Sequence, residues 1–229
     1  MGSHLSHHQR RNGPSPYQLG GLSGHDVRAR ITTKGGASLD SVFPGAETGP
    51  MAVLLKDRGV VFPYTPTIMT AMNANYGTHA PTHSNFTYKF FQNYSLQDIT
   101  ITCAFTAHTT TEGLYMAGVL HFFKSAMKMG FGADDPHRGV PPPVLEFSAW
   151  GPAWHEKVPV VISNVTHNID GQTDYVWPSS EDIDANSSMM PLKTDFIIQM
   201  SPTYSTRSTR KEYNSRDFYN GNLLRKGYI

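Results

Sequence analysis

Hydrophobic and polar positions alternate with a period of two along much of this chain. Between residues 84 and 107, Phe86, Tyr88 and Phe90 alternate with polar residues. After a short bend, apolar residues again occupy every second position from Ile99 to Phe105. This period places apolar side chains on one face of a strand. We therefore predict two long antiparallel strands here, paired with each other, and further strands over 67–72, 144–150, 158–169, 173–177 and 192–204.

One segment departs from this pattern and has helical periodicity. Thr109 and Glu112 have the spacing of a capping box, in which both side chains bond to backbone N–H groups at the start of a helix. Met116, Leu120 and Phe123 then recur at helical spacing, which is typical of a helix with one buried face. Two glycines follow shortly afterwards, and glycine commonly ends a helix. We predict a single helix near residues 110–129, packed on the predicted sheet.

The density of large apolar residues divides the chain into a central domain and two terminal segments. Residues 1–50 are rich in Gly, Pro, Ser and His and hold too few large apolar residues to form a core alone. We expect an extended N-terminal arm there, either ordered against a partner or disordered. Residues 51–204 carry the predicted strands and helix, and residues 205–229 form a predicted C-terminal arm. The expected fold is mainly β, an antiparallel sandwich or barrel with one packed helix and extended arms.

Composition narrows the range of functions. Only 16% of the 229 residues are charged, against roughly 25% in an average globular protein. A net charge of +1 argues against a strongly basic nucleic-acid binder. The lone Cys103 excludes a disulfide within the chain, and its apolar neighbours predict that it is buried. No window holds 18 apolar residues and the first residues lack an apolar core, so we expect neither a membrane span nor a signal peptide.

Catalytic motifs are missing from the sequence. It holds no nucleophile elbow, zinc-protease motif, phosphate-binding loop or calcium-binding loop, and we expect no enzymatic activity, no cofactor and no metal. Pro81 lies between His79 and His83, so these two histidines cannot share a regular helical face. Together with His108 and His121 they are more simply explained as polar or surface residues. An enzyme with a His or Asp site is the minor alternative.

Candidate binding residues concentrate near the C-terminus. Basic and aromatic side chains are interleaved there, a mixture that can bind nucleic acid by charge and stacking. Glu212 and Asp217 dilute the positive charge, so docking on a neighbouring subunit is the interpretation that we favour. The predicted interface residues are Tyr204, Arg207, Arg210, Tyr213, Arg216, Phe218, Tyr219 and Tyr228. Elsewhere, Trp150, Trp154 and Trp177 lie near predicted strand ends, where exposed indoles could stack on sugars.

The order of elements resembles that of a known family. Two long β segments run into one aromatic-rich helix over residues 86–132. A strand follows, then the run Val158–Ile169 with an Asp-Gly turn. The last strand, Phe196–Met200, leads through Ser201–Tyr204 into an Arg-rich end. Over residues 84–229 this order resembles the baseplate tube-initiator proteins of contractile-tailed bacteriophages, which are relatives of the tail-tube protein.

The resemblance implies a structural virion protein. Such proteins form a homohexameric ring that joins the baseplate hub to the tail tube and contributes to the DNA channel. The implied partners are further copies of the chain, the tail-tube protein, hub proteins and the tape-measure protein, with phage DNA only in transit and no membrane. The implied location is the tail baseplate of a virion assembled in the host bacterial cytoplasm. The alternatives are a major tail-tube protein, a neck or minor capsid protein, and a β-sandwich glycan-binding module.

Overall fold

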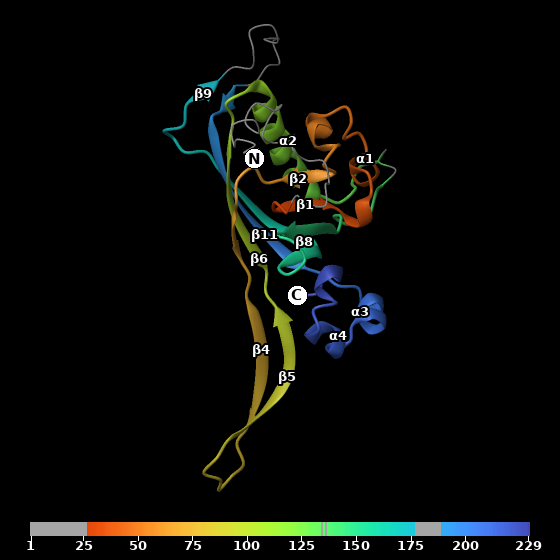
Figure 1. The fold of residues 1–229 in the computed structure, drawn as a ribbon, viewed down its shortest axis with the longest axis vertical. Coiled ribbons are helices and arrows are strands. Elements are labelled where there is room, and N and C mark those ends of the chain that lie inside the picture. The colour runs from red at the N-terminus through yellow and green to blue at the C-terminus, as the bar shows by residue number, and fades with distance from the viewer. Residues whose placement is uncertain (1–26, 134, 136, 177–188) are drawn as a thin grey trace, which may run out of the picture.

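A seven-stranded antiparallel sheet is the centre of the molecule (Figure 1). The computed structural model describes residues 27–133, 135, 137–176 and 189–229. Strands make up 36% and helices 23% of the structure, which confirms the mainly β prediction, and the described sheet is open rather than closed into a barrel. In the order β2-β1-β7-β8-β11-β6-β3, its strands are Gly59–Val61, Arg30–Thr33, Leu145–Ala149, His155–Asn168, Lys193–Pro202, Ile99–Thr106 and Thr67–Met69.

Two further strand pairs and several helices surround this sheet. Strands β4 (Met72–His79) and β5 (Tyr88–Leu96) form a long hairpin, and β9 (Tyr175–Val176) pairs with β10 (Met190–Pro191). The α-helices are α1 (Leu39–Val42), α2 (Thr110–Ala126), α3 (Thr206–Glu212) and α4 (Ser215–Tyr219). The short 3-10 segments are η2 (Lys34–Gly36), η3 (Pro50–Leu54) and η4 (Leu224–Lys226).

The β4–β5 hairpin is an extension of the strands of the sheet. Met69 of β3 pairs with Thr100 of β6, and Met72 of β4 pairs with Leu96 of β5. The backbone N–H of Gln97 donates to the carbonyl of Ala71 between them (2.9 Å). The hydrogen-bonded ladder between the two strand paths therefore continues from the sheet into the hairpin. Between these two pairs, the path through β5 and β6 has one residue more than the path through β3 and β4. Figure 1 shows the hairpin projecting well beyond the rest of the molecule.

This continuity corrects the predicted pairing of the two strands in residues 84–107. β5 and β6 do not pair with each other. β5 pairs with β4, whereas β6 pairs with β3 and β11. The short connection at Gln97 and Asp98 is a local irregularity in one long strand path, because the chain on both sides of it stays paired with the continuous path of β3 and β4. Alternation alone could not distinguish a bulge from a turn at this point.

The core lies between one face of the sheet and helix α2. The odd-numbered side chains of β6 from Ile99 to Phe105 are buried, as the alternation predicted. Phe196 of β11 packs against Phe105 and against Phe123 of α2, with ring centroids 5.4 and 5.9 Å apart. Cys103 is 6% exposed, as predicted, and burial raises the pKa of its thiol to about 12. The sulfur therefore acts as a small packing group.

Helix α2 begins with the predicted capping arrangement. The hydroxyl of Thr109 accepts a hydrogen bond from the backbone N–H of Glu112 (3.3 Å). The carboxylate of Glu112 accepts in return from the backbone N–H of His108 (2.8 Å). Two N–H groups that have no partner within the helix are thus satisfied. The helix ends at Ala126, three residues before the predicted limit.

The described part of the predicted N-terminal arm belongs to the folded domain. Residues 1–26 lie outside the described residues. Strand β1 is inserted between β2 and β7, and the side chains of Ile31 and Leu39 are fully buried. Phe43 packs edge-on against Phe122 of α2 at 5.5 Å. A short strand inserted between two others buries only one or two apolar side chains. The low density of apolar residues over 1–50 therefore does not exclude a strand in that segment.

Helix α2 also covers the outer edge of the sheet at β2. The hydroxyl of Tyr115 accepts from the backbone N–H of Val61 (2.8 Å) and donates to the carbonyl of Val61 (3.0 Å). Because these groups are buried, we expect Tyr115→Phe to lower the free energy of unfolding by about 1–3 kcal/mol. Urea unfolding measures this. Tyr64→Phe, which removes an exposed bond to Thr106, is the control and should change stability by less than about 0.5 kcal/mol.

Candidate assembly surface

The β4–β5 hairpin exposes an unusual amount of apolar surface. Six of its large apolar side chains are 50–60% exposed, and Phe86 near its tip is 73% exposed. The half-exposed residues are Met72, Tyr76, Tyr88, Phe90, Phe91 and Tyr94. Isolated two-stranded hairpins are marginally stable in water, and contiguous exposed apolar patches mark interaction sites. The hairpin is therefore the candidate assembly surface of this chain.

The root of the hairpin, next to the sheet, has one apolar and one polar face. The register pairs Met72 with Leu96 and Ala74 with Tyr94, so these four side chains share a face. On the opposite face the amide of Asn75 donates to the amide oxygen of Asn93 (2.7 Å). An amphipathic ribbon of this kind is suited to contact protein on one side only.

The outer half of the hairpin is aromatic on both faces. The rings of Tyr76 and Phe91 meet edge-on at 5.8 Å on one face. On the other face the ring of Phe90 lies over Gly77, where an added Cβ would be 2.4 Å from that ring. Any side chain at Gly77 would displace Phe90. This half of the hairpin therefore exposes aromatic groups on both faces, a pattern that suits contact with protein from two sides.

The predicted C-terminal arm folds onto its own domain. Gly227 approaches the backbone of β8 so closely that a Cβ would be 2.3 Å from the carbonyl oxygen of Lys157. Leu223 and Tyr228 are 1% and 6% exposed. The ring of Tyr228 is stacked on that of Tyr204 (5.1 Å, 6° between planes). Residues 205–229 therefore form a small folded unit with α3, α4 and η4 rather than an extended arm.

The predicted interface residues of this segment separate into two groups. The aromatic side chains come together, because Tyr213 contacts Tyr228 at 5.8 Å and Phe218 at 6.0 Å. Burial, and to a lesser extent the neighbouring Tyr213, raises the pKa of Tyr94, so the cluster lies near Tyr94 at the hairpin root. The remaining predicted residues are exposed on the unit's surface, where docking on a neighbour stays a prediction: Arg207, Arg210, Arg216 and Tyr219.

The stacked tyrosines make the C-terminal unit sensitive to alkaline pH. The hydroxyl of Tyr204 donates to the carbonyl of Gly227 (2.8 Å), and burial raises the pKa of Tyr204 to about 12. An unfolded chain loses this proton near pH 10. The folded chain keeps it, so stability should fall as the pH rises from about 10 to about 12. We expect Tyr204→Phe to flatten this part of the curve, measured by urea unfolding across the range, and an unchanged slope would contradict this assignment.

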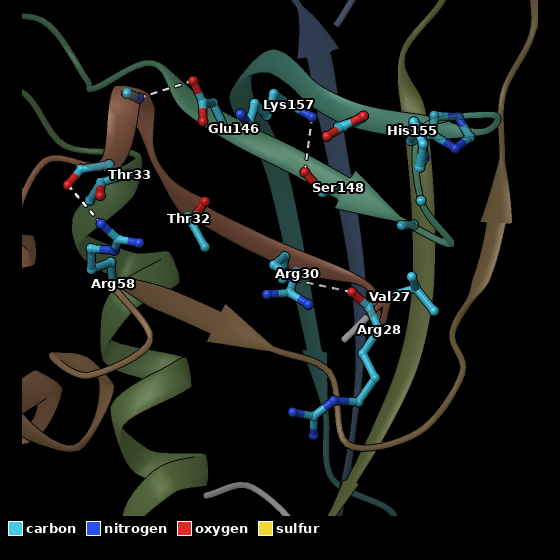
Figure 2. A pocket seen from close by; sticks show the side chains of 16 residues that line it. Val27, Arg28, Arg30, Thr32, Thr33, Arg58, Glu146, Ser148, His155 and Lys157 are labelled. Atoms are coloured by element: carbon cyan, nitrogen blue, oxygen red, sulfur yellow. Dashed lines mark hydrogen bonds between the residues drawn. The ribbon is translucent and has the colours of Figure 1, made fainter. Parts of the chain in front are cut away.

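A separate pocket of about 620 Å³ lies on the sheet near β1, β7 and the start of β8 (Figure 2). Its charged side chains include three arginines, one lysine and two glutamates. Glu146 accepts from the backbone N–H of Gly35 (2.9 Å) and Arg58 donates to the carbonyl of Gly36 (3.0 Å), so both hold the adjacent turn. Figure 2 shows the cations spread along the pocket rather than around one point, and this arrangement does not define an anion site.

The other sequence candidates are not gathered into a site. The described residues contain no group of three or more His, Cys, Asp or Glu side chains placed to hold a metal ion. Trp150 and Trp154 are close, with ring centroids 6.2 Å apart, and are 39% and 62% exposed. Trp177 lies outside the described residues. Within the described part of the chain, no helix is both long and apolar enough to span a membrane.

Sequence reasoning missed the hairpin as a site. It placed Phe86, Tyr88 and Phe90 on one face of a strand and did not identify β4 as a strand. The available signal was the neighbouring pair Phe90-Phe91, which breaks alternation, and the Asn-rich run Met72–Gly77 opposite it. Comparison with protein-family models and with curated proteins found no match for this chain.

Proposed function

We propose that this chain is a structural virion subunit, a tube-initiator ring protein that joins the baseplate hub of a contractile phage tail to the tail tube. The observation that carries the proposal is the projecting β4–β5 hairpin with its half-exposed apolar side chains. Permanent subunit contacts would bury a surface of this kind, since obligate interfaces resemble a protein core cut in half. The type of assembly, the tube–baseplate junction of a phage tail, is taken from the family resemblance of residues 84–229.

The arrangement of free strand edges supports ring formation. The described part of β5 pairs only with β4, and β4 only with β5, so each has an unpaired edge. Exposed edges of long strands promote pairing with further chains. A head-to-tail contact between edges of successive copies closes into a ring when the rotation allows it. A hexameric ring whose strands form a continuous barrel around a DNA channel is the proposed assembly, with the tail-tube protein stacked on one side and hub proteins on the other.

Antibody-gold imaging of phage particles from the source of this sequence tests the proposal. Label confined to the junction of tube and baseplate, at a few copies per particle, is the expected result. Label along the whole tube would replace the initiator assignment with a major tail-tube protein, and label at the head–tail junction would indicate a neck protein. Unlabelled particles would overturn the virion assignment altogether.

A second measurement separates this proposal from the glycan-binding alternative, which the exposed pair Trp150 and Trp154 favours. Sedimentation of the purified chain should show rings or larger assemblies and no stabilisation by sugars. A small oligomer whose Tm rises with a mono- or oligosaccharide would favour the glycan-binding module. Trp154→Ala should remove that rise if the indole stacks on the sugar and should leave ring formation unchanged.

A further inference from the structure

The C-terminal unit, residues 205–229, concentrates positive charge that the rest of the chain lacks. It carries six basic and two acidic side chains, whereas residues 1–204 carry thirteen basic and sixteen acidic ones. The six basic side chains are all exposed: Arg207, Arg210, Lys211, Arg216, Arg225 and Lys226. A chain with a net charge of only +1 therefore has one strongly basic region, and that region is folded against β8.

Three of these cations form a stripe along one face of α3. Arg207, Arg210 and Lys211 lie three and four positions apart in the helix, so their side chains are neighbours on its surface. We call these three residues the basic stripe. Like charges at this spacing destabilise a helix, so the stability of the single chain does not favour this arrangement.

The opposite face of α3 packs toward the domain. It carries Thr209 and Glu212, and both lie close to Tyr228, which is 6% exposed. Burial raises the pKa of Tyr228, Glu212 raises it further, and a hydrogen bond with Thr209 lowers it. Figure 1 shows α3 on the side of the C-terminal unit that lies away from the central sheet. The basic stripe therefore points outward, away from the domain.

The positive charge of the C-terminal unit is not neutralised within the described part of the chain. There, none of its six cations has a carboxylate within ion-pair distance. The unit's own acidic residues do not face the basic stripe, because Glu212 lies toward Tyr228 and Asp217 on α4 is only partly exposed. A surface with unpaired cations is complementary to a partner that presents negative charge.

The aromatic residues of the C-terminal unit favour a protein as this partner. Tyr219 is 83% exposed and Tyr213 is 45% exposed. Tyrosine and arginine are enriched among the residues that contribute most to protein–protein binding. The backbone of double-stranded DNA would supply phosphates for the arginines, but its outer surface offers no flat group on which these tyrosine rings could stack.

A second copy of this chain is a poor match for the same surface. Several carboxylates of the described residues are buried or already have partners. Asp57 is 5% exposed, Asp98 accepts from the hydroxyl of Ser201 (2.6 Å), and Asp195 is paired with Lys193 at 3.4 Å. A different protein that presents several Asp and Glu side chains together is the more suitable partner.

We infer that the C-terminal unit docks on an acidic surface of a different virion protein, through the basic stripe together with Arg216 and Tyr219. The inference rests on the proposed function, because it names the kind of partner that one side of the proposed ring contacts. Complementary charges speed association and fix the orientation of the two partners. The basic stripe thus selects which neighbour the ring accepts on that side.

Charge reversal at Arg207 and Arg216 tests the role of the cations. Both residues lie in the first turn of their helices, where a carboxylate interacts favourably with the helix dipole, so Arg207→Glu with Arg216→Glu should leave the unit folded. Incorporation into phage particles should fall at least about tenfold, because like charges then face each other across the contact. Lys34→Glu with Lys56→Glu makes the same change of charge at exposed positions outside the unit and should incorporate like wild type.

Photo-crosslinking in assembled particles identifies the partner. Tyr219 is replaced with p-benzoylphenylalanine, and the crosslinked peptide is sequenced by mass spectrometry. We expect a peptide of another virion protein in which Asp and Glu outnumber Lys and Arg. Phe131, which is also 83% exposed but lies outside the C-terminal unit, is the matched control position and should not crosslink to that peptide.

The possible results separate the inference from the proposed function. A crosslink from Tyr219 to DNA, to a second copy of this chain or to a peptide without excess acidic residues would overturn the inference, and so would no crosslink at all. Normal incorporation of the arginine double variant, with its unit shown by protease resistance to be folded, would also overturn it, as would an equal loss in the lysine control. In each of these cases the ring assignment stands. If the wild-type chain is missing from particles, the proposed function fails and the inference with it.

Discussion

Replacing both Tyr76 and Phe91 with serine is expected to prevent assembly of this chain while leaving its domain folded. The two rings contact each other at 5.8 Å and are 57% and 59% exposed in the single chain. They therefore contribute little to the core but present a large apolar area to a partner. Buried aromatic anchors typically contribute 2 kcal/mol or more each to an interface. Losing two anchors per subunit should weaken association by about 10³-fold or more.

Sedimentation velocity and incorporation into phage particles measure this effect, and thermal unfolding monitors the fold. We expect the double variant to stay monomeric with a Tm within a few degrees of wild type. Phe131→Ser is the matched control, because Phe131 is 83% exposed but lies outside the hairpin. Normal assembly of the double variant, or equal loss of assembly in the control, would show that the hairpin is not the assembly surface.

The second large effect is expected from Gly227→Ala, which should detach the C-terminal unit from β8. Gly227 has a φ of +82°, and its added Cβ would lie 2.3 Å from a backbone oxygen and 2.9 Å from a backbone carbon of Lys157. Backbone atoms in a strand cannot give way. The left-handed conformation alone costs a non-glycine residue roughly 1–2 kcal/mol. Because the clash adds to this strain, we expect Gly227→Ala to lower the free energy of unfolding by about 3–4 kcal/mol. Point mutations reach this size only through a specific structural conflict of this kind.

Gly221→Ala separates the clash from the conformational strain. Gly221 lies in the same unit and has a φ of +74°, but the nearest atom to its added Cβ is a side-chain carbon of Leu224 at 3.7 Å. We expect Gly221→Ala to lower the free energy of unfolding by only about 1 kcal/mol. Protease sensitivity of residues 205–229 and urea unfolding report both effects. Similar losses in the two variants would mean that the close approach to β8 does not hold the unit.

Local signals predicted the central elements well. Alternation identified β6, β7, β8 and β11, because each has one face against the core and one face in water. The capping spacing of Thr109 and Glu112 located α2 to within one residue at its start. These features depend on neighbours within a few positions, and such information is present in any short window of the sequence.

Long-range pairing was beyond the same signals. The insertion of β1 between β2 and β7 is determined by contacts with residues far along the chain, and only Ile31 and a few others mark it. The exposed aromatics of the hairpin have the residue types of a core strand, so their alternation does not show whether Phe90 is buried or exposed. What distinguishes an interface strand from a core strand is the absence of a covering element within its own chain, and that becomes visible only in three dimensions.

The continuity of β3 with β4 and of β5 with β6 has a mechanical consequence. A pull on the hairpin tip along its length is transmitted through two covalent backbones directly into the central sheet. There it acts parallel to the ladder between β6 and β11, which runs over eight paired positions from Lys193 to Met200. Hydrogen bonds loaded in this shearing direction share the force and must fail together, whereas bonds peeled from one end break singly. The hairpin is thus anchored to bear tension, and a pull on its tip would load the ladder between β6 and β11 in shear.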